Sequence, residues 1–290
     1  MSGRPVFRFA PSPNGELHLG HALSALICCE RARAAGGRFL LRIEDIDAGR
    51  VRADFVDGIF RDLAWLGLAW EEPVLLQSAR MHAYRDAVRR LAAMGLLYPC
   101  YATRSEIEAA AGADAARDPD GAPIYPGIWK GCPHEDLARM HASGAASALR
   151  IDMGAARGAV QTKLAGTPLT FTELGEVPAR ETVPARPERW GDAVLVRKDV
   201  PTSYHLAVVV DDAWQGVTHI VRGRDLYPAT DLHRLLQVLL DLPEPVYHHH
   251  RLIVDASGRK LSKSARDTSL RSLRDAGATP ADVRRLVGLG

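Results

Sequence analysis

Residues 8–21 read Arg-Phe-Ala-Pro-Ser-Pro-Asn-Gly-Glu-Leu-His-Leu-Gly-His, and this segment carries the strongest indication of the fold class. The apolar run over residues 6–10 predicts a short strand. The sequence Ser-Pro-Asn-Gly over residues 12–15 predicts a tight turn, because proline fixes φ while asparagine and glycine tolerate positive φ. A helix is predicted over residues 19–35, ending at two glycines. Strand, tight turn and helix form the first unit of a nucleotide-binding α/β fold, in which the helix N-terminus faces the ligand above the strand ends.

His18 and His21 lie three residues apart at the predicted helix start, and therefore on one face of the helix. Two imidazoles beside open backbone N–H groups suit a polyphosphate, whose charge grows during phosphoryl or nucleotidyl transfer. Gly20 has no side chain, so a flat ring can lie against the backbone there. A bare His-x-Gly-His is more often a pair of surface histidines. The assignment therefore depends on the strand, the turn and a distant partner motif.

The partner motif is Lys-Leu-Ser-Lys-Ser over residues 260–264, which follows Asp-Ala-Ser-Gly-Arg over residues 255–259. A loop that carries glycine and serine can move, and the side chains of Lys260 and Lys263 can reach a departing pyrophosphate. Alone, such a motif is usually a solvated basic loop.

Together the two motifs resemble the HIGH and KMSKS signatures of class I aminoacyl-tRNA synthetases. Further segments are similar to the catalytic domain of glutamyl-tRNA synthetases, in the same order along most of the chain, namely residues 8–15, 42–47, 204–207, 210–212 and 221–223. The sequence departs from that family at Asn14, where a threonine is usual. It departs again at Val208, which replaces an asparagine and removes one polar contact to the amino acid.

The resemblance implies attack of the glutamate α-carboxylate on the α-phosphorus of ATP, giving glutamyl-adenylate and pyrophosphate, with Mg²⁺ accompanying ATP. His18, His21 and Lys263 would be catalytic, and Gly20 and Lys260 would complete the ATP site. Two arginines in one amino-acid site favour a substrate with two carboxylates. The implied glutamate site consists of Arg8, Phe9, Ala10, Pro11, Ser12, Glu44, Tyr204 and Arg222.

A group of short proteins, the glutamyl-queuosine tRNA(Asp) synthetases, resembles the sequence best. They transfer glutamate to the queuosine base in the anticodon of tRNA(Asp), so the resemblance implies the anticodon arm of tRNA(Asp) as the RNA partner. Because the chain ends soon after Lys263, we expect no anticodon-binding domain. Three alternatives stay open: a truncated glutamyl-tRNA synthetase that charges a tRNA 3′ end, a non-tRNA ligase that uses the adenylate, and a catalytically silent RNA-binding relative.

Many members of this group hold zinc with Cys-x-Cys, a tyrosine and a later cysteine. Cys100 and Tyr125 match that pattern. Ala102 and Trp129 stand where cysteines would be, and Cys132 lies three residues beyond the matching position. Two thiolates and a phenol do not complete a tetrahedral site. Zinc is therefore doubtful, and we expect Trp129 to pack in its place.

The predicted fold class is α/β, a Rossmann-type nucleotide-binding domain split by an α+β insertion and followed by short C-terminal helices. The two halves are expected over residues 1–98 and 189–240, with the inserted lobe over 99–188 and the KLSKS loop and C-terminal helices over 241–290. Two local predictions matter below. The apolar, β-branched run over residues 204–210 predicts a buried parallel strand, with Asp211 and Asp212 at its end. A further strand is predicted over 251–254, directly after three histidines.

The composition bounds the protein class. Hydrophobic content of 47% and charged content of 25% are typical of a soluble globular protein. The formal net charge of +2 provides no global basic field, so RNA contacts must come from local patches. No apolar run approaches a membrane span, and four cysteines do not predict a disulfide scaffold. We expect a reduced, cytoplasmic monomer.

Overall fold

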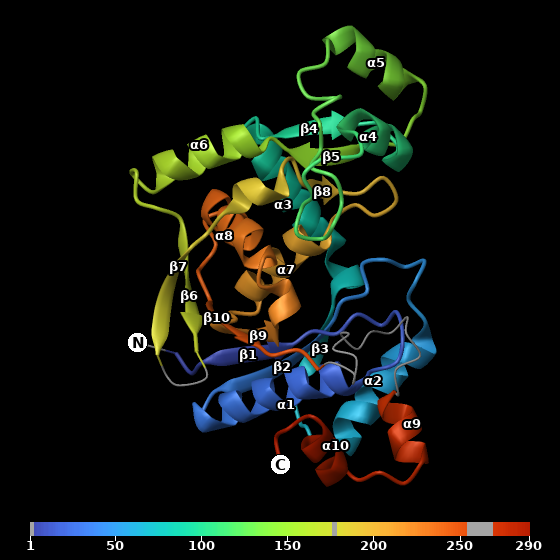
Figure 1. Cartoon of the computed structure of the whole chain (residues 1–290), viewed down its shortest axis with the longest axis vertical. Coiled ribbons are helices and arrows are strands. Elements are labelled where there is room, and N and C mark those ends of the chain that lie inside the picture. The colour runs from blue at the N-terminus through green and yellow to red at the C-terminus, as the bar shows by residue number, and fades with distance from the viewer. Residues whose placement is uncertain (1–2, 176–178, 254–268) are drawn as a thin grey trace.

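The structure, a computed structural model, describes residues 3–175, 179–253 and 269–290. A seven-stranded sheet of order β3-β2-β1-β9-β10-β6-β7 forms its centre (Figure 1). All neighbouring strands are parallel except β6 and β7, which are antiparallel. The strands are β1 (Val6–Phe9), β2 (Arg38–Ile43), β3 (Glu71–Leu76), β6 (Thr170–Leu174), β7 (Arg180–Pro184), β9 (His219–Gly223) and β10 (Val246–His250). The strand order confirms the predicted doubly wound α/β fold.

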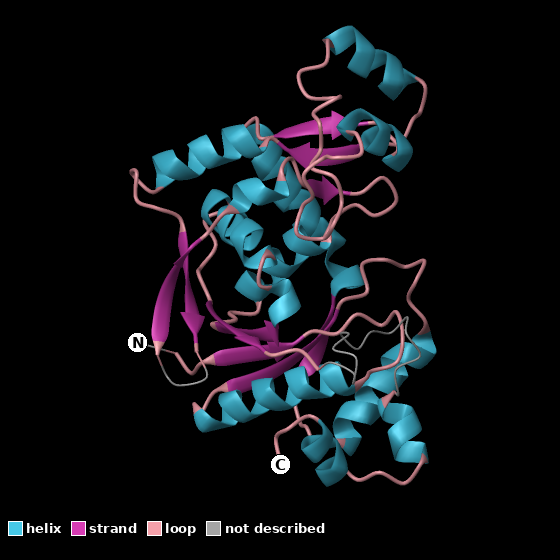
Figure 2. Ribbon diagram, in the orientation of Figure 1, coloured by secondary structure: helices cyan, strands magenta, loops and turns pink. Residues whose placement is uncertain are grey.

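Helices cover both faces of this sheet (Figures 1 and 2). The face drawn downward carries α1 (Leu19–Ala34), α2 (Ala53–Trp65), α9 (Leu270–Asp275) and α10 (Pro280–Leu286). The opposite face carries α3 (Met81–Ala93), α7 (Tyr204–Trp214) and α8 (Ala229–Leu239). Short 3₁₀ helices lie at η1 (Gln77–Arg80), η2 (Pro187–Trp190) and η3 (Arg224–Leu226).

A second, antiparallel sheet of three strands lies at the far end of the molecule, in the order β4-β5-β8 (Figure 1). Its strands are β4 (Leu97–Cys100), β5 (Ala148–Ile151) and β8 (Val194–Val196). The accompanying helices are α4 (Arg104–Ala111), α5 (His134–Ala142) and α6 (Met153–Lys163). This small sheet with its helices is the predicted α+β insertion.

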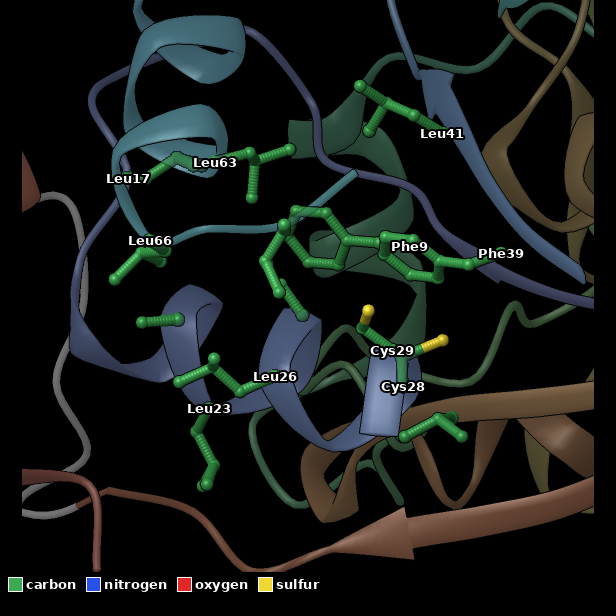
Figure 3. Close-up of a cluster of buried hydrophobic side chains, with 14 of the residues drawn as sticks. Phe9, Leu17, Leu23, Leu26, Cys28, Cys29, Phe39, Leu41, Leu63 and Leu66 are labelled. Carbon is green, nitrogen blue, oxygen red and sulfur yellow. The ribbon is translucent and has the colours of Figure 1, made fainter. Parts of the chain in front are cut away.

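Alternation along the strands sorts the side chains between the two faces. Phe9 and Phe39 point to the α1 face and join one buried cluster (Figure 3). Cys28 and Cys29 complete that cluster from α1. The alternate residue Arg8 therefore faces α7, where the site described below is built.

The prediction of a strand over residues 204–210 is wrong. These residues form the first two turns of α7, whose N-cap is Ser203, with its hydroxyl accepting from the backbone N–H of Leu206 at 3.4 Å. Asp211 and Asp212 belong to the same helix rather than to a strand end. Residues 206–209 are all buried, because α7 is enclosed by neighbouring elements. A helix buried on every side shows the same continuous apolar run as a buried strand.

Two further predictions about segments differ from the structure. The histidines themselves form strand β10, and residues 251–253 have no regular secondary structure. Strands β6 and β7, placed by the predicted boundaries in the inserted lobe, extend the large sheet, and β10 also belongs to it. Both differences arise because segments that are distant in the sequence pair as neighbouring strands, and no local pattern encodes such pairing. Pattern reasoning also missed β3, β7, α5 and α6.

Candidate active site

One cavity of about 480 Å³ opens at the carboxyl ends of β1 and β9. These two strands flank the point where the strand order reverses, which is where open α/β sheets bind ligands. All of the described residues predicted to bind glutamate or ATP line it, namely Arg8, Phe9, Ala10, Pro11, Ser12, His18, Gly20, His21, Glu44, Tyr204 and Arg222. Lys260 and Lys263 lie outside the described residues.

The cavity also has walls outside the residues predicted to bind glutamate or ATP, and among them only the histidines over 248–250 were expected near the nucleotide. Asp225 and Leu226 follow β9, and His250 and Leu252 lie at and beyond the end of β10. A signal was present in the sequence, because polar residues after neighbouring parallel strands gather at one sheet edge.

His18 and His21 form a reciprocal cap at the start of α1. The Nδ1 atom of His18 accepts from the backbone N–H of Gly20 at 3.0 Å, and the Nδ1 atom of His21 accepts from the backbone N–H of His18 at 3.1 Å. Because each Nδ1 is an acceptor, a neutral ring carries its proton on Nε2. The capping arrangement therefore fixes both the orientation and the tautomer of the two rings, whose centroids lie 3.9 Å apart.

Gly20 is required by the neighbouring ring. A Cβ atom at this position would lie 2.9 Å from Cε1 and 3.1 Å from Nδ1 of His18. Contacts that short force a shift, and the group that would shift is the His18 imidazole. The absence of a side chain thus protects the position of His18 as well as leaving room in the cavity.

A buried chain of charges supports the opposite wall. Arg8 makes a bidentate pair with Asp212, Nε to Oδ1 at 2.9 Å and Nη2 to Oδ2 at 3.2 Å. Arg42 donates to the same carboxylate at 2.6 Å and to Glu44 Oε1 at 3.1 Å. Two cations and two carboxylates therefore alternate in a space from which water is largely excluded, with side-chain exposures between 0% and 9%.

The charges in this chain shift one another's pKa values. Burial opposes ionisation of Asp212, but the guanidinium groups of Arg8 and Arg42 outweigh it and lower the pKa of that carboxyl. At Glu44 burial dominates and raises the pKa, although Arg42 and Arg8 act against it. A ligand ammonium group beside Glu44 would favour its ionised form.

Arg222 has a different environment. Its guanidinium donates from Nε to His249 Nε2 at 3.1 Å and from Nη2 to Thr230 Oγ1 at 2.7 Å, and Nη1 lies 3.2 Å from His233 Nδ1. The pKa values of His233 and His249 are lowered, first by burial and then by Arg222, so both rings are neutral at pH 7. Arg222 itself is 4% exposed.

No carboxylate forms a salt bridge to Arg222 within the ranges that the structure describes, although Arg8 and Arg42 both have one. A buried cation supported only by neutral groups is costly unless an anion joins it. The cavity therefore presents a cation suited to a carboxylate of a ligand.

Tyr204 opens α7 and reaches the same cavity. Burial raises the pKa of its hydroxyl, so the group stays a neutral donor and acceptor. Asp211 fixes the helix from behind, accepting from Arg80 and Tyr84, each at 2.6 Å, and from Gln77 at 2.9 Å. The two adjacent carboxylates of α7 thus have different roles. Asp211 anchors the helix through its three hydrogen bonds, and Asp212 holds the two arginines that support the cavity wall.

The cysteines of the inserted lobe do not gather around a common point. Cys100 donates to the hydroxyl of Tyr125 at 3.4 Å, whereas the thiol of Cys132 bonds the Ile128 carbonyl at 3.5 Å. Trp129 packs against the cluster of Cys100, Ala102 and Tyr125, as expected. Among residues 3–175, 179–253 and 269–290, no three His, Cys, Asp or Glu side chains are grouped to hold a metal ion. The residues present do not fit zinc.

In the described part of the chain, no helix combines the length and the apolar composition needed to span a lipid bilayer.

Comparison with known proteins identifies the family. The family described as "tRNA synthetases class I (E and Q), catalytic domain" matches residues 6–289. The chain is 48% identical to the glutamyl-Q tRNA(Asp) synthetase of Rhodobacter capsulatus, over 98% of this chain and 100% of that protein. It is 40% identical to the glutamyl-Q tRNA(Asp) synthetase of Symbiobacterium thermophilum, over 95% of this chain and 83% of that protein.

A solved structure agrees with this result. The crystal structure of glutamate-tRNA synthetase from Elizabethkingia anophelis superposes with a TM-score of 0.69 at 25% identity. The match covers 95% of this chain and 54% of that one, so the chain spans about half of the solved structure. The chain belongs to the class I tRNA synthetases of the glutamate and glutamine type, and within them to the glutamyl-Q tRNA(Asp) synthetases.

Proposed function

We propose that this chain activates L-glutamate with ATP to give glutamyl-adenylate, and transfers the glutamate to the queuosine base in the anticodon of tRNA(Asp). One observation carries the proposal: a single cavity at the sheet switch point gathers two capped histidines, a glycine that leaves their rings undisturbed, and a buried arginine without a carboxylate partner among the described residues. The two histidines and the glycine suit a nucleotide, and the buried arginine suits an acidic amino acid.

The amino acid would lie between Arg222, Tyr204 and Glu44. Arg222 would bind one carboxylate of glutamate, since its described partners are all neutral. Glu44 would accept from the substrate ammonium group. With Arg222 assigned to the side-chain carboxylate, a neutral amide such as glutamine would leave this arginine without an anion, and a site built for a charged group rejects an analogue that lacks it. Arg8, already paired with Asp212 through Nε and Nη2, would contribute the N–H groups of Nη1.

Use of ATP follows from the class I synthetase family. His18 and His21, with their protons on Nε2, would donate to phosphate oxygens while charge develops at the α-phosphorus. Lys260 and Lys263 would accompany the departing pyrophosphate, and Mg²⁺ would neutralise part of the phosphate charge. Positioning and charge stabilisation suffice for this step, so no covalent enzyme nucleophile is required.

The test is transfer of labelled glutamate, with ATP and Mg²⁺, to three purified RNAs: tRNA(Asp) that carries queuosine, tRNA(Asp) that lacks it, and tRNA(Glu). The products are digested and the labelled nucleoside is identified. Glutamate-dependent ATP–pyrophosphate exchange is measured alongside, so that activation and transfer are scored separately. The expected result is label on queuosine alone.

Other results would contradict the proposed acceptor. Label on the terminal adenosine of tRNA(Glu) would make the chain a minimal charging enzyme. Exchange without label on any RNA would indicate a ligase with an acceptor other than tRNA. Absence of exchange would contradict glutamate activation itself.

A further inference from the structure

The support of Arg222 continues beyond the residues that touch it. His249 accepts from Arg222 through Nε2 at 3.1 Å, and its Nδ1 lies 2.8 Å from Oε2 of Glu173. The second oxygen of Glu173 accepts from the backbone N–H of His249, also at 2.8 Å. Glu173 lies on β6 and does not line the cavity, whereas Arg222 does. Three side chains from the neighbouring strands β6, β10 and β9 thus form a chain of contacts that ends in the cavity.

The directions of these hydrogen bonds determine where the proton of His249 lies. Arg222 can only donate, so Nε2 of His249 must be the acceptor. An ionised Glu173 can only accept, so Nδ1 must carry the proton. The two neighbours therefore select one tautomer of a neutral ring. Thr230 is compatible with this tautomer, since its hydroxyl lies 3.2 Å from Nε2 and can donate there.

The contact between Glu173 and His249 is a hydrogen bond to a neutral ring rather than an ion pair. Burial, and then the positive charge of Arg222, lower the pKa of His249 to about 2. The ring is also held in place by stacking, with the Tyr247 ring parallel to within 4° and the Tyr227 ring edge-on at 4.9 Å. Such packing fixes the plane of the imidazole but not which nitrogen is protonated.

We propose that Glu173 is a positioning residue for the amino-acid site: it holds His249 in the Nδ1–H tautomer, and Nε2 of that ring then keeps the guanidinium of Arg222 aimed into the cavity. With the opposite tautomer, an Nε2–H would face the Nε–H of Arg222, and two donors would repel each other. Loss of Glu173 would therefore reorient Arg222 without removing any group that touches the ligand. The effect on substrate rests on the proposed function, whereas the effect on His249 and Arg222 does not.

The first variant is Glu173→Gln, which keeps the size of the side chain. Glu173 meets the backbone N–H and Nδ1 of His249 with two different oxygens, whereas a glutamine has a single oxygen and places an NH₂ donor where the second oxygen was. The expected result is a rise of about tenfold or more in the KM for glutamate, with the KM for ATP unchanged, because an arginine that binds charge depends on its orientation. Glu181 is exposed and lies on β7, at the position opposite Glu173 in the β6–β7 strand pair. Glu181→Gln is therefore the matched control. It should leave both constants unchanged.

A double variant asks whether Glu173 acts through His249. In His249→Gln the amide oxygen can replace Nε2 as the acceptor for Arg222, and no ring tautomer remains to be selected. Adding Glu173→Gln to this variant should then change the KM for glutamate no further. A further rise in the double variant would overturn the proposal, since Glu173 would then act independently of His249.

Nuclear magnetic resonance of nitrogen-15 provides a readout that needs no substrate. In the unaltered protein His249 should show a protonated Nδ1 and an unprotonated Nε2, with the signals assigned by their loss in His249→Gln. In Glu173→Gln the pattern should change, and the Nε–H signal of Arg222 should move with it. An unchanged His249 pattern, or a changed pattern with an unmoved Arg222 signal, would overturn the proposal. If the unaltered protein showed no glutamate activation, the proposed function would fail while these signals still tested the positioning role.

Discussion

Arg8 and Asp212 lie 204 positions apart in the chain and are joined by two hydrogen bonds of 2.9 and 3.2 Å in the interior. The same carboxylate accepts from Arg42 at 2.6 Å. Asp212 therefore holds two cations that come from adjacent parallel strands, and it does so from a helix on the sheet face that bears the cavity.

Replacing Asp212 by asparagine should destabilise the fold strongly. The amide cannot balance the charges of Arg8 and Arg42, and breaking a buried ion pair by removing one partner costs about 3–5 kcal/mol. The free energy of unfolding from urea titration measures this loss. Asp86→Asn is the control, since Asp86 pairs with Arg89 on an exposed helix face and such pairs contribute at most about 1 kcal/mol. Equal losses of unfolding free energy in the two variants would contradict the role of Asp212 as the anion that balances two buried arginines.

Replacing Gly20 by alanine should separate activity from stability. The new Cβ would lie 2.9 Å from Cε1 of His18 and displace the ring, so the rate of ATP–pyrophosphate exchange should fall by about tenfold or more. Alanine is the better helix former by up to about 1 kcal/mol, but displacement of the His18 ring removes a cap of about the same size, so the free energy of unfolding should change little. Gly58→Ala in α2 is the control, because a Cβ there meets nothing within 4 Å. Exchange at the wild-type rate in Gly20→Ala would show that the position of His18 is unimportant.

Replacing Arg222 by lysine should weaken glutamate binding although the charge is kept. A lysine cannot reach His249, Thr230 and a ligand carboxylate together, because it lacks the planar, forked donor set of arginine. The KM for glutamate should rise by about a hundredfold, and the KM for ATP should change little. The neighbouring Arg224 is exposed and does not line the cavity, so Arg224→Lys tests for a general effect of lysine at this turn. A similar rise in the KM for glutamate in Arg224→Lys would contradict a specific role of Arg222 in binding the substrate carboxylate.

Histidines whose pKa values are lowered in the folded protein should make stability depend on pH. Burial lowers the pKa of His205 from 6.5 to about 4, so between these values the unfolded chain binds a proton that the folded chain does not. Stability therefore rises with pH across this window and is lost as the pH falls, by about 1.4 kcal/mol per pH unit for one such group. His205→Gln should reduce the slope of unfolding free energy against pH by one proton. His82→Gln, at an exposed position, should leave the slope unchanged. If the unfolding free energies of His205→Gln and the wild type changed with pH by the same slope, the lowered pKa of His205 would be contradicted.

Local sequence signals predicted the elements whose causes are local. The apolar run over residues 6–10, the turn over residues 12–15 and the two glycines after residue 35 were sufficient to place β1 and α1, and both were confirmed. The described residues assigned to the amino-acid and nucleotide sites also gather in one cavity, because parallel strands end at one sheet edge. Here the resemblance to the synthetase family and the rule that ligands bind at the carboxyl ends of parallel strands pointed to the same residues.

The remaining features depend on pairing between distant segments. The run over residues 204–210 looked like a strand because enclosure on all sides erases the period that marks a helix. Glu173 gave no signal, since its relation to Arg222 passes through His249 and exists only once β6 lies beside β10. Composition and spacing cannot encode a neighbour that is 76 positions away.

The separation between Arg8 and Asp212 also has a consequence for synthesis on the ribosome. The cavity takes residues from β1, from the start of α7 and from the segment after β10, so its walls leave the exit tunnel at widely different times. Loops of this length close slowly, and contacts across them form late in folding. Until residue 253 has emerged, the nascent chain holds Arg8 and Arg42 without a complete cavity around them. Newly made protein therefore gains its complete cavity only after residue 253 has emerged, and fragments released before that point would lack one wall of it.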